Sequence, residues 1–298
     1  MVVSVPGTLS NLGPGYDALG LAVSLTNRFT FRFDAPGFSA QGAPIEPDDH
    51  LTLATARRAA EAFGVELPSL HVRQEEQVPR ARGLGSSATA RVAGLLAAMS
   101  LRPAPVPVEE QLAFLCAEEG HPDNVTPALL GGLCVVGFEG ERLHHLRLAP
   151  PEGLAVALCV PDLEVSTPEA RRILPAAVSH QDAAFTAGRM AFLMAGLLGG
   201  RHEALAIGAQ DRLHQDHRAS LIGPVEQAFE AARAAGALAS FVSGSGSTLA
   251  SLVPAGGPVQ RVAEALCGPF REEGVDATGL SVELQGHGAV VCPEGGGA

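Results

Sequence analysis

The chain has 298 residues, of which 46% are hydrophobic and 17% charged, a composition typical of a globular protein with one or two cores. Its formal net charge of -12 disfavours nucleic acid and anionic membrane surfaces as partners. All 20 basic residues are arginines, which excludes mechanisms that need a lysine, among them a Schiff base and a Walker A loop.

The cysteines indicate a reducing compartment. There are 5 of them, and none forms a C-x-x-C pair, so we expect reduced and mostly buried thiols. The first six residues contain no basic region followed by a long apolar run, so no signal peptide is expected, and no stretch reaches the apolar length of a membrane span. These features predict a cytoplasmic protein.

The first half of the chain is expected to mix short strands with helices. Residues 2–5 form a β-type run that Pro6 stops, and the turn cluster 11–15 follows. Apolar runs and alternation predict further strands, whereas helical spacing and alanine-rich composition predict helices. The predicted strands are 20–25, 29–33, 70–72 and 131–138, and the predicted helices are 51–63, 86–99 and 109–116.

Residues 150–153, Pro-Pro-Glu-Gly, are the best candidate hinge, which predicts an N-terminal domain 1–153 and a C-terminal domain 154–298. The second half is expected to contain strands 154–160, 238–242, 248–253 and 280–292 and helices 168–174, 182–198, 202–208, 224–235 and 258–267. Strands and helices are mixed without a βαβ rhythm, so we predict an α+β fold. The tail 293–298 is expected to be frayed.

The most informative stretch is residues 78–89, Val-Pro-Arg-Ala-Arg-Gly-Leu-Gly-Ser-Ser-Ala-Thr. Gly83 and Gly85 allow positive φ and a close approach of the backbone to a ligand. Ser86 or Ser87 is expected to cap the following helix, whose free N–H groups make the segment an anion site. A serine hydroxyl can also join a Mg²⁺ shell. The alternative interpretation is a plain glycine-rich turn with a serine cap.

Residues 79–88 resemble the phosphate-binding motif of the GHMP kinases, whose pattern is roughly Pro-x-x-x-Gly-Leu-Gly-Ser-Ser-Ala. Residues 5–22 and 243–249 resemble the first and third motifs of that family, in the family's order. Within the family, three further strings resemble homoserine kinases, namely 119–132, 166–175 and 210–222. The resemblance therefore covers most of the chain.

The chain departs from the family pattern at five positions. Tyr16 stands where Phe is usual, His217 where Tyr is common and Gly223 where Pro is common. Ser245 and Ser247 replace the usual Ala and Pro of the third motif. Most of these are changes in loop packing, but His217 adjoins an expected substrate arginine, so the fine shape of the substrate pocket stays open.

The resemblance implies two α+β domains, the first like the second domain of ribosomal protein S5 and the second ferredoxin-like. It implies ATP-dependent phosphorylation of the side-chain hydroxyl of L-homoserine in threonine biosynthesis, with Mg²⁺ as cofactor, the substrate between the halves, and a homodimer as a family-level expectation. ATP is expected on the loop formed by Pro79, Arg80, Ala81, Arg82, Gly83, Leu84, Gly85, Ser86, Ser87, Ala88 and Thr89.

Five residues are expected to hold the amino-acid zwitterion. By resemblance Arg171 and Arg218 bind the carboxylate, for which a planar, permanently charged guanidinium is suited, and the alternative for each is a surface salt bridge. Asp17 and Asn11 are expected against the ammonium, and their alternative is turn chemistry. Thr167 either bonds the substrate or caps the helix that follows it.

The resemblance also implies a phosphoryl-transfer site. Glu119 is expected to be the carboxylate ligand of Mg²⁺, with Glu118 as the alternative, and Ser87 to add a hydroxyl ligand. Asn124 aligns where mevalonate kinase-type relatives carry a catalytic Asp. A neutral amide cannot act as a general base, so we expect Asn124 to orient the substrate hydroxyl. The proton then leaves to a phosphate oxygen in a loose transition state, without a side-chain base.

We expect no metal role for the histidines. His121, followed by Pro, is interpreted as the opening of a turn, because Mg²⁺ prefers oxygen ligands. His144, His145 and His214 have no Cys or carboxylate companions at zinc spacing and are expected to be structural or exposed.

Two other functions compete with the kinase hypothesis. One is a GHMP kinase acting on mevalonate or a related alcohol, against which Asn124 and the two arginine strings argue. The other is a non-catalytic binding or regulatory protein on the same scaffold. The intact glycine-serine loop, together with Glu119 and Asp17, argues against that second alternative.

Overall fold

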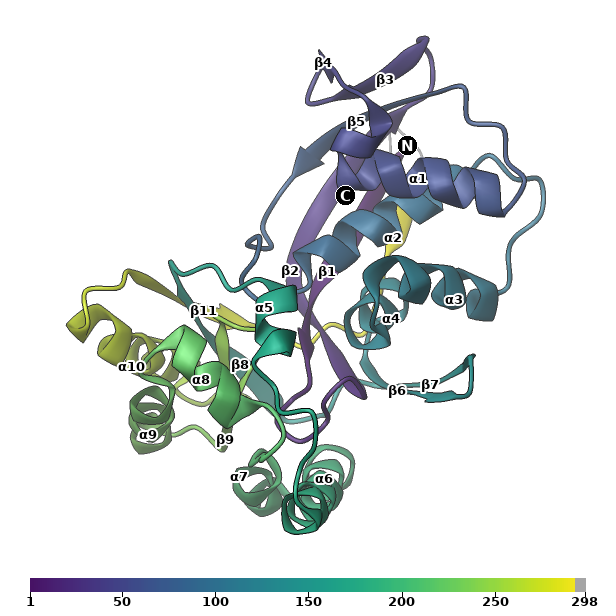
Figure 1. Cartoon of the computed structure of the whole chain (residues 1–298). Coiled ribbons are helices and arrows are strands. Elements are labelled where there is room, and N and C mark those ends of the chain that lie inside the picture. Colours follow the sequence, from purple (N-terminus) through teal and green to yellow (C-terminus); the bar gives the residue numbers. More distant parts are fainter. Residues whose placement is uncertain (293–298) are drawn as a thin grey trace.

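The computed structural model describes residues 1–292 and contains two β-sheets (Figure 1). The first has eight strands in the order β12-β1-β2-β5-β3-β4, and β6, which also pairs with β2, carries β7 at its other edge. Its strands are β1 (Val2–Ser10), β2 (Leu19–Arg32), β3 (Gly37–Ala40), β4 (Ala43–Pro44), β5 (Ser69–Glu75), β6 (Leu133–Glu139), β7 (Arg142–Leu148) and β12 (Val290–Cys292).

Helices cover one face of this first sheet. They are η1 (Pro47–Asp49), α1 (Leu51–Ala62), α2 (Ser86–Met99), α3 (Val108–Glu119) and α4 (Pro122–Leu130). Phe29 and Phe31 of β2 pack with the alanines and leucines of α1 and α2 in one buried cluster. A Cβ on Gly94 of α2 would lie 2.4 Å from the backbone oxygen of Thr52, so α1 and α2 touch backbone to backbone. Apart from these two aromatic rings, the fully buried residues of this cluster are aliphatic, and the cluster is tightly packed.

The second sheet has four antiparallel strands in the order β11-β8-β10-β9. They are β8 (Leu154–Pro161), β9 (Ala239–Val242), β10 (Leu249–Pro254) and β11 (Ala277–Val282). Alternation along β8 divides its side chains between two clusters. Ala157 and Cys159 pack with α9 (Val225–Ala235) and α10 (Val259–Glu272), whereas Val156 and Leu158 pack with α6 (His180–Gly199) and α7 (Leu205–Gly208).

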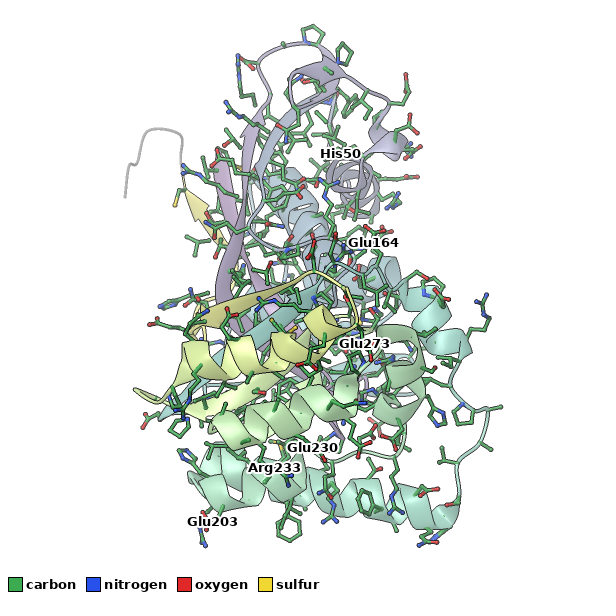
Figure 2. All side chains as sticks on the ribbon, turned by 90° about the vertical axis from the view of Figure 1, so that its left-hand side faces the viewer. His50, Glu164, Glu203, Glu230, Arg233 and Glu273 are labelled. Atoms are coloured by element: carbon green, nitrogen blue, oxygen red, sulfur yellow. The ribbon has the colours of Figure 1, made fainter. Side chains whose placement is uncertain are left out.

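The two sheets share one core. Leu9 and Leu21 of the first sheet lie in the same buried cluster as Leu158 and Phe241 of the second. Three short elements complete the second half, η2 (His202–Ala204), α5 (Thr167–Arg172) and α8 (Gln215–Ile222). Most carboxylates that give the chain its charge lie on the surface, and Figure 2 shows Glu164, Glu203, Glu230 and Glu273 on the second half, whereas Asp123 and Asp211 are buried.

The chain crosses from the first sheet to the second between β7 and β8, where residues 150–153 lie, and returns with β12, which pairs with β1 through Val3 and Val291. The domain boundary at residue 153 stays a prediction. The α+β class is confirmed, and so are helices near 51–63 and 86–99. The tail 293–298, predicted to be frayed, lies outside the described residues.

Several element predictions are wrong in detail. β1 does not stop at Pro6 but continues to Ser10, with a register shift between Pro6 and Thr8 where the missing N–H is tolerated. The strands at 20–25 and 29–33 are one strand, β2, and the final strand at 280–292 is divided between β11 and β12. Prediction missed α4, α8 and β7 altogether.

Candidate active site

A pocket of about 260 Å³ lies between the halves, and all six segments singled out in the sequence contribute to it. Thirteen of the predicted site residues line it: Asn11, Asp17, Ala81, Arg82, Gly83, Gly85, Ser86, Ser87, Glu119, Asn124, Thr167, Arg171 and Arg218. Further lining residues were not predicted: Ser10, His121, Asp123, Val165, Ser166, Gly244 and Ser245.

The glycine-serine loop forms one end of the pocket. Gly83 and Gly85 have φ of +75° and +70°, as expected, and neither has room for a side chain. A Cβ on Gly83 would lie 2.2 Å from the backbone oxygen of Ser243, and one on Gly85 would lie 2.1 Å from Oγ1 of Thr8. The backbone itself therefore forms this wall, followed by the N-terminus of α2, which is an arrangement suited to an anion.

The expected serine cap of α2 is wrong. Gly85 is the N-cap residue and no side chain caps the helix, because Ser86 and Ser87 are its first two residues. Their hydroxyls are thereby left for other partners. Five predicted loop residues lie outside the pocket lining, and their part in ATP binding stays a prediction: Pro79, Arg80, Leu84, Ala88 and Thr89. Arg80 is exposed and pairs with Glu76, whereas Leu84, Ala88 and Thr89 are buried.

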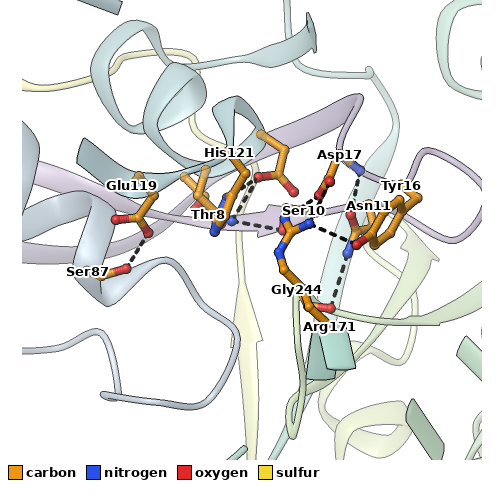
Figure 3. A network of polar contacts seen from close by, with 12 residues as sticks. Thr8, Ser10, Asn11, Tyr16, Asp17, Ser87, Glu119, His121, Arg171 and Gly244 are labelled. Atoms are coloured by element: carbon orange, nitrogen blue, oxygen red, sulfur yellow. Dashed lines mark hydrogen bonds and ion pairs between the residues drawn. The ribbon is translucent and has the colours of Figure 1, made fainter. Parts of the chain in front are cut away.

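Two glutamates at the end of α3 point in different directions. Glu119 accepts a hydrogen bond from Ser87 Oγ at 2.5 Å (Figure 3) and another from Arg91 Nε at 2.5 Å. Glu118 instead accepts two hydrogen bonds from Arg58 Nε at 2.9 and 2.8 Å and does not line the pocket. This geometry favours Glu119 over Glu118 as a metal ligand.

The donor set suits Mg²⁺. No group of three or more His, Cys, Asp and Glu that could hold a metal occurs within residues 1–292. Mg²⁺ does not need such a cage, since it binds one or two carboxylates and completes its shell with phosphate oxygens and water. The adjoining oxygens of Ser87 and Glu119, at the edge of an anion site, fit this requirement.

Asn124 is held by three side chains. Its Oδ1 accepts from Thr8 Oγ1 at 2.7 Å, and its Nδ2 donates to Ser10 Oγ at 3.0 Å and to Asp123 Oδ1 at 3.3 Å. Its amide is therefore fixed in one orientation, with Asp123 beside it in the pocket wall. Thr8 and Ser10 lie just before Asn11 in the first motif and were not predicted as site residues. Only their contacts with Asn124 in the folded chain identify them as part of the site.

His121 is a pocket residue and not merely the opening of a turn. It lies at the N-cap of α4, and its Nδ1 is 2.7 Å from Asp123 Oδ1. Burial alone would lower the pKa of His121, but the hydrogen bond and charge of Asp123, with a contribution from Glu119, raise it above its usual value. A protonated imidazole is thus favoured next to the buried Asp123 carboxylate.

The other end of the pocket carries an ion pair across the halves. Arg171 donates from Nη1 to Asp17 Oδ2 at 2.9 Å and from Nη2 to Asp17 Oδ1 at 2.8 Å (Figure 3). Asn11 Oδ1 accepts from the backbone N–H of Asp17 at 3.0 Å. Asn11 and Asp17 have φ of +69° and +54°, so turn chemistry and pocket lining coincide at these two residues.

Arg171 keeps one edge open. A guanidinium has five N–H donors and two edges that can each grip a carboxylate. Asp17 takes the Nη1/Nη2 edge. Within the described part of the chain, no acceptor bonds Nε, so the Nε/Nη2 edge remains available to a second carboxylate.

Arg218 is a buried cation that has no counter-ion among residues 1–292. It is 2% exposed, and it donates to Gly244 O at 2.6 Å and lies 3.2 Å from Nδ1 of His214. No carboxylate of residues 1–292 lies within ion-pairing distance of it. Burial lowers the pKa of Arg218, an energetic cost that an anion in the pocket would offset.

His214, expected to be structural or exposed, is fully buried and supports Arg218. Burial lowers the pKa of His214 to about 4, so the ring is neutral. Its Nε2–H donates to Gly13 O at 2.7 Å, which leaves Nδ1 to accept from Arg218. Asp211 accepts from the backbone N–H of residues 213, 214 and 215 and thereby fixes the start of α8, which carries Arg218.

Thr167 does not cap α5. The N-cap is Ser166, whose Oγ accepts from the backbone N–H of Glu169 at 3.3 Å, and Thr167 is the first helical residue. Thr167 lines the pocket, so its bond to the substrate stays a prediction.

The third motif lies against the first two. Ser243 Oγ donates to Gly83 O at 2.7 Å, and the backbone N–H of Thr248 donates to Arg82 O at 3.1 Å. The backbone N–H of Gly244 donates to Ser10 O at 3.2 Å. The three motifs therefore form one continuous hydrogen-bonded wall.

Two sequence profiles match the chain. The profile of the GHMP kinases N terminal domain matches residues 50–132, and that of the GHMP kinases C terminal domain matches residues 193–272. The homoserine kinases of Thermosynechococcus vestitus and Trichormus variabilis are each 39% identical to the chain. The first alignment covers 98% of both chains, and the second covers 97% of this chain and 98% of the relative.

Solved structures agree with the fold. The homoserine kinase of Cytophaga hutchinsonii is 28% identical, with a TM-score of 0.87 over 98% of this chain and 97% of that one. The mevalonate kinase of L. major, in complex with R-mevalonate, is 15% identical, with a TM-score of 0.66 over 94% of this chain and 95% of that one. The latter likeness concerns the fold alone.

Proposed function

This chain belongs to the GHMP kinase family, among the homoserine kinases, and from that membership we propose that it transfers the γ-phosphoryl group of ATP to the side-chain hydroxyl of L-homoserine. The observation that carries the proposal is the pair of arginines at one end of the pocket. Among the described residues 1–292, Arg218 is buried without a counter-ion, Arg171 keeps an open edge, and Asp17 is adjacent. An amino-acid zwitterion matches this charge pattern.

The amino-acid end works by charge complementarity. The substrate carboxylate is held by Arg218 and by the Nε/Nη2 edge of Arg171, which neutralises the buried cation. The substrate ammonium is held by the Asp17 carboxylate, and Asn11 Oδ1 fixes the turn by accepting from the backbone N–H of Asp17. Because Asp17 and Arg171 already form an ion pair, the group for the ammonium and the group for the carboxylate are both oriented before the substrate binds.

The phosphate end works by backbone donors and oxygen ligands. The loop containing Gly83 and Gly85 and the first N–H groups of α2 receive the phosphates. Ser87 and Glu119 would hold Mg²⁺, and the ion would supply positive charge against the phosphates. Arg91 donates to Oε2 of Glu119 and thereby keeps Oε1 of the same carboxylate directed at Ser87.

The reacting hydroxyl lies between the two ends. Asn124, fixed by Thr8 and Ser10, orients it without removing its proton, which leaves to a phosphate oxygen. Asp123 and His121 form a hydrogen-bonded pair alongside, and we propose that they hold charge and orientation at this point and do not serve as the base.

Two alternatives are weaker. A mevalonate-type acceptor has a carboxylate but no ammonium, which leaves Asp17 without its substrate contact, and the solved mevalonate kinases support the fold alone. A non-catalytic binding protein would not need Ser87 bonded to Glu119 or Asn124 fixed by Thr8. No helix within residues 1–292 is long and apolar enough to cross a membrane. A cytoplasmic location and a homodimer are further proposals, the first supported by five free cysteines.

The test is an ADP-release assay with Mg²⁺-ATP and four conditions: homoserine, mevalonate, serine, and no acceptor. Turnover with homoserine alone is the expected result. Turnover with mevalonate in preference to homoserine would replace the proposal with the first alternative, and ATP binding without turnover on any acceptor would replace it with the second. Light scattering on the same preparation measures the mass and tests the homodimer.

A further inference from the structure

We propose that Tyr16 is a positioning residue that selects for the carboxylate of the amino-acid substrate, because it holds the guanidinium groups of Arg171 and Arg218 in their binding orientation. The inference rests on the proposed function and deepens it. Tyr16 belongs to the turn between β1 and β2, next to Asp17, and is half-buried. It does not line the pocket, so any influence on substrate passes through its neighbours.

Tyr16 contacts both arginines. Its hydroxyl oxygen accepts from Arg171 Nη1 at 3.0 Å (Figure 3). The Cζ atoms of Arg171 and Arg218 lie 5.7 and 5.3 Å from the centre of its ring, both within the range of a cation–π interaction. The ring of His214 lies 5.2 Å from it at an angle of 37°. One aromatic ring thus contacts two cations and the imidazole that supports one of them.

This arrangement addresses an electrostatic difficulty. Two guanidinium groups directed at one carboxylate repel each other, and Arg218 has no counter-ion within residues 1–292. The negative face of an aromatic ring attracts both without neutralising either. Tyr16 therefore stabilises the pair of charges and leaves them available to the substrate, whereas a carboxylate in its place would compete for them.

The hydroxyl adds orientation. Arg171 Nη1 is engaged by both Tyr16 and Asp17, so the guanidinium cannot rotate to offer that nitrogen to the pocket. The Nε/Nη2 edge is then the edge presented to a second carboxylate. A phenylalanine, the residue usual at this position in the family pattern, would keep the ring but not this bond. A chain with the usual phenylalanine therefore lacks the hydroxyl contact to Arg171.

The experiment compares Tyr16→Phe, which removes the hydroxyl, with Tyr16→Leu, which removes the ring as well. The acceptors are homoserine and 2-aminobutane-1,4-diol, in which a hydroxymethyl group replaces the carboxylate. For Tyr16→Phe we expect KM for homoserine to rise about five-fold, the effect of one hydrogen bond, with kcat and KM for ATP unchanged. KM for the diol should not change, so discrimination between the acceptors falls by the same factor.

A double-mutant cycle tests whether Tyr16 acts through Arg171. In an Arg171→Ala background, Tyr16→Phe should change KM for homoserine no further, because the bonded partner is gone. A full five-fold loss in that background would overturn the inference, as would an unchanged KM in the single variant or equal losses on both acceptors. Thermal unfolding verifies that each variant is folded, and Tyr16→Phe alone decides if Tyr16→Leu does not fold.

The wild-type measurement separates this inference from the proposed function. Absence of homoserine turnover by the wild-type chain would overturn the proposed function, and the inference with it. Wild-type turnover together with unaltered kinetics in Tyr16→Phe would overturn only the role of Tyr16.

Discussion

Asp17 and Arg171, 154 positions apart in the sequence, form a two-point ion pair with both N–O distances below 3 Å. The pair joins the turn after β1 to α5 and so bridges the two halves directly at the pocket. A pair about one-third exposed contributes little to stability by itself, since solvent screens it. Its value lies in fixing the directions of the two charges.

The arginines provide the most direct test of the substrate end. Arg171→Ala and Arg218→Ala should each lower kcat/KM for homoserine by about 30- to 150-fold, the loss of a charge-assisted bond, with KM for ATP little changed. The matched control is Arg172→Ala, whose exposed side chain is next in sequence to Arg171 and does not line the pocket. Steady-state kinetics on all three variants measures this, and equal behaviour of Arg171→Ala and Arg172→Ala would contradict the assignment.

The two adjacent glutamates form a second matched pair. Glu119→Gln should lower kcat by about 100-fold and raise the Mg²⁺ concentration needed for half-maximal rate, because a neutral amide binds the ion poorly. Glu118→Gln should change both quantities far less, because Glu118 faces Arg58 and reaches the contacts of Glu119 only through Arg91, at 3.5 Å. Titration of activity with Mg²⁺ separates them. A larger effect for Glu118→Gln would reverse the assignment.

Asn124→Asp tests the absence of a side-chain base. The change replaces the Nδ2 donor to Ser10 and puts a second carboxylate beside Asp123, so kcat should fall. The pH profile of kcat is the measurement. A gain in rate, with a new acidic limb, would mean that the site can use a base and would contradict the proposed proton path.

Gly85 should tolerate no side chain. In Gly85→Ala the added Cβ would meet Thr8 Oγ1 at 2.1 Å, at a φ of +70° that costs about 1–2 kcal/mol for an L-residue. We expect loss of ATP turnover and a lower free energy of unfolding. Gly188→Ala is the control: this α6 glycine has open space around it, and the change should stabilise the helix by up to about 1 kcal/mol. Urea unfolding measures both, and an active, stable Gly85→Ala would refute the loop geometry.

His214 should make stability depend on pH. Its folded pKa of about 4 lies below the ordinary histidine pKa of 6.5, so between these values the unfolded chain binds more protons and acid favours unfolding. The contribution is complete above pH 6.5 and is lost as pH falls towards 4, with a slope approaching about 1.4 kcal/mol per pH unit. Urea unfolding of the wild type and of His214→Gln across this range should give curves that converge in acid. Parallel curves would show that burial does not lower the pKa of His214.

The local features of the site could be predicted from the sequence. Glycines at 83 and 85 indicated positive φ, and the alanine-rich run after them indicated α2, because both are local properties of the backbone. Helix α4 was not predicted, and it contains two prolines. Pro122 stands at its start, where a missing N–H costs nothing, and Pro127 lies inside it. Local rules count the second proline as a breaker, but burial of the helix outweighs it.

The contacts between segments could not be predicted. Nothing near Asn124 in the sequence indicates that Thr8 and Ser10 hold its amide, since the pairs are 116 and 114 positions apart. The same holds for Gly13 and His214, which meet through tertiary packing alone. His214 was expected to be structural or exposed, and the sequence could not decide between the two, because a histidine without ligand spacing carries no local signal of burial.

The environment of Tyr16 also has an optical consequence. Tyr16 is the sole tyrosine of the chain, and there is no tryptophan. All ultraviolet emission from tyrosine therefore originates beside Arg171 and Arg218, at the amino-acid end of the pocket. Unlabelled protein thus carries a single tyrosine that can report the arrival of an amino acid, and the phosphate loop 79–89 contains no aromatic residue that could do so.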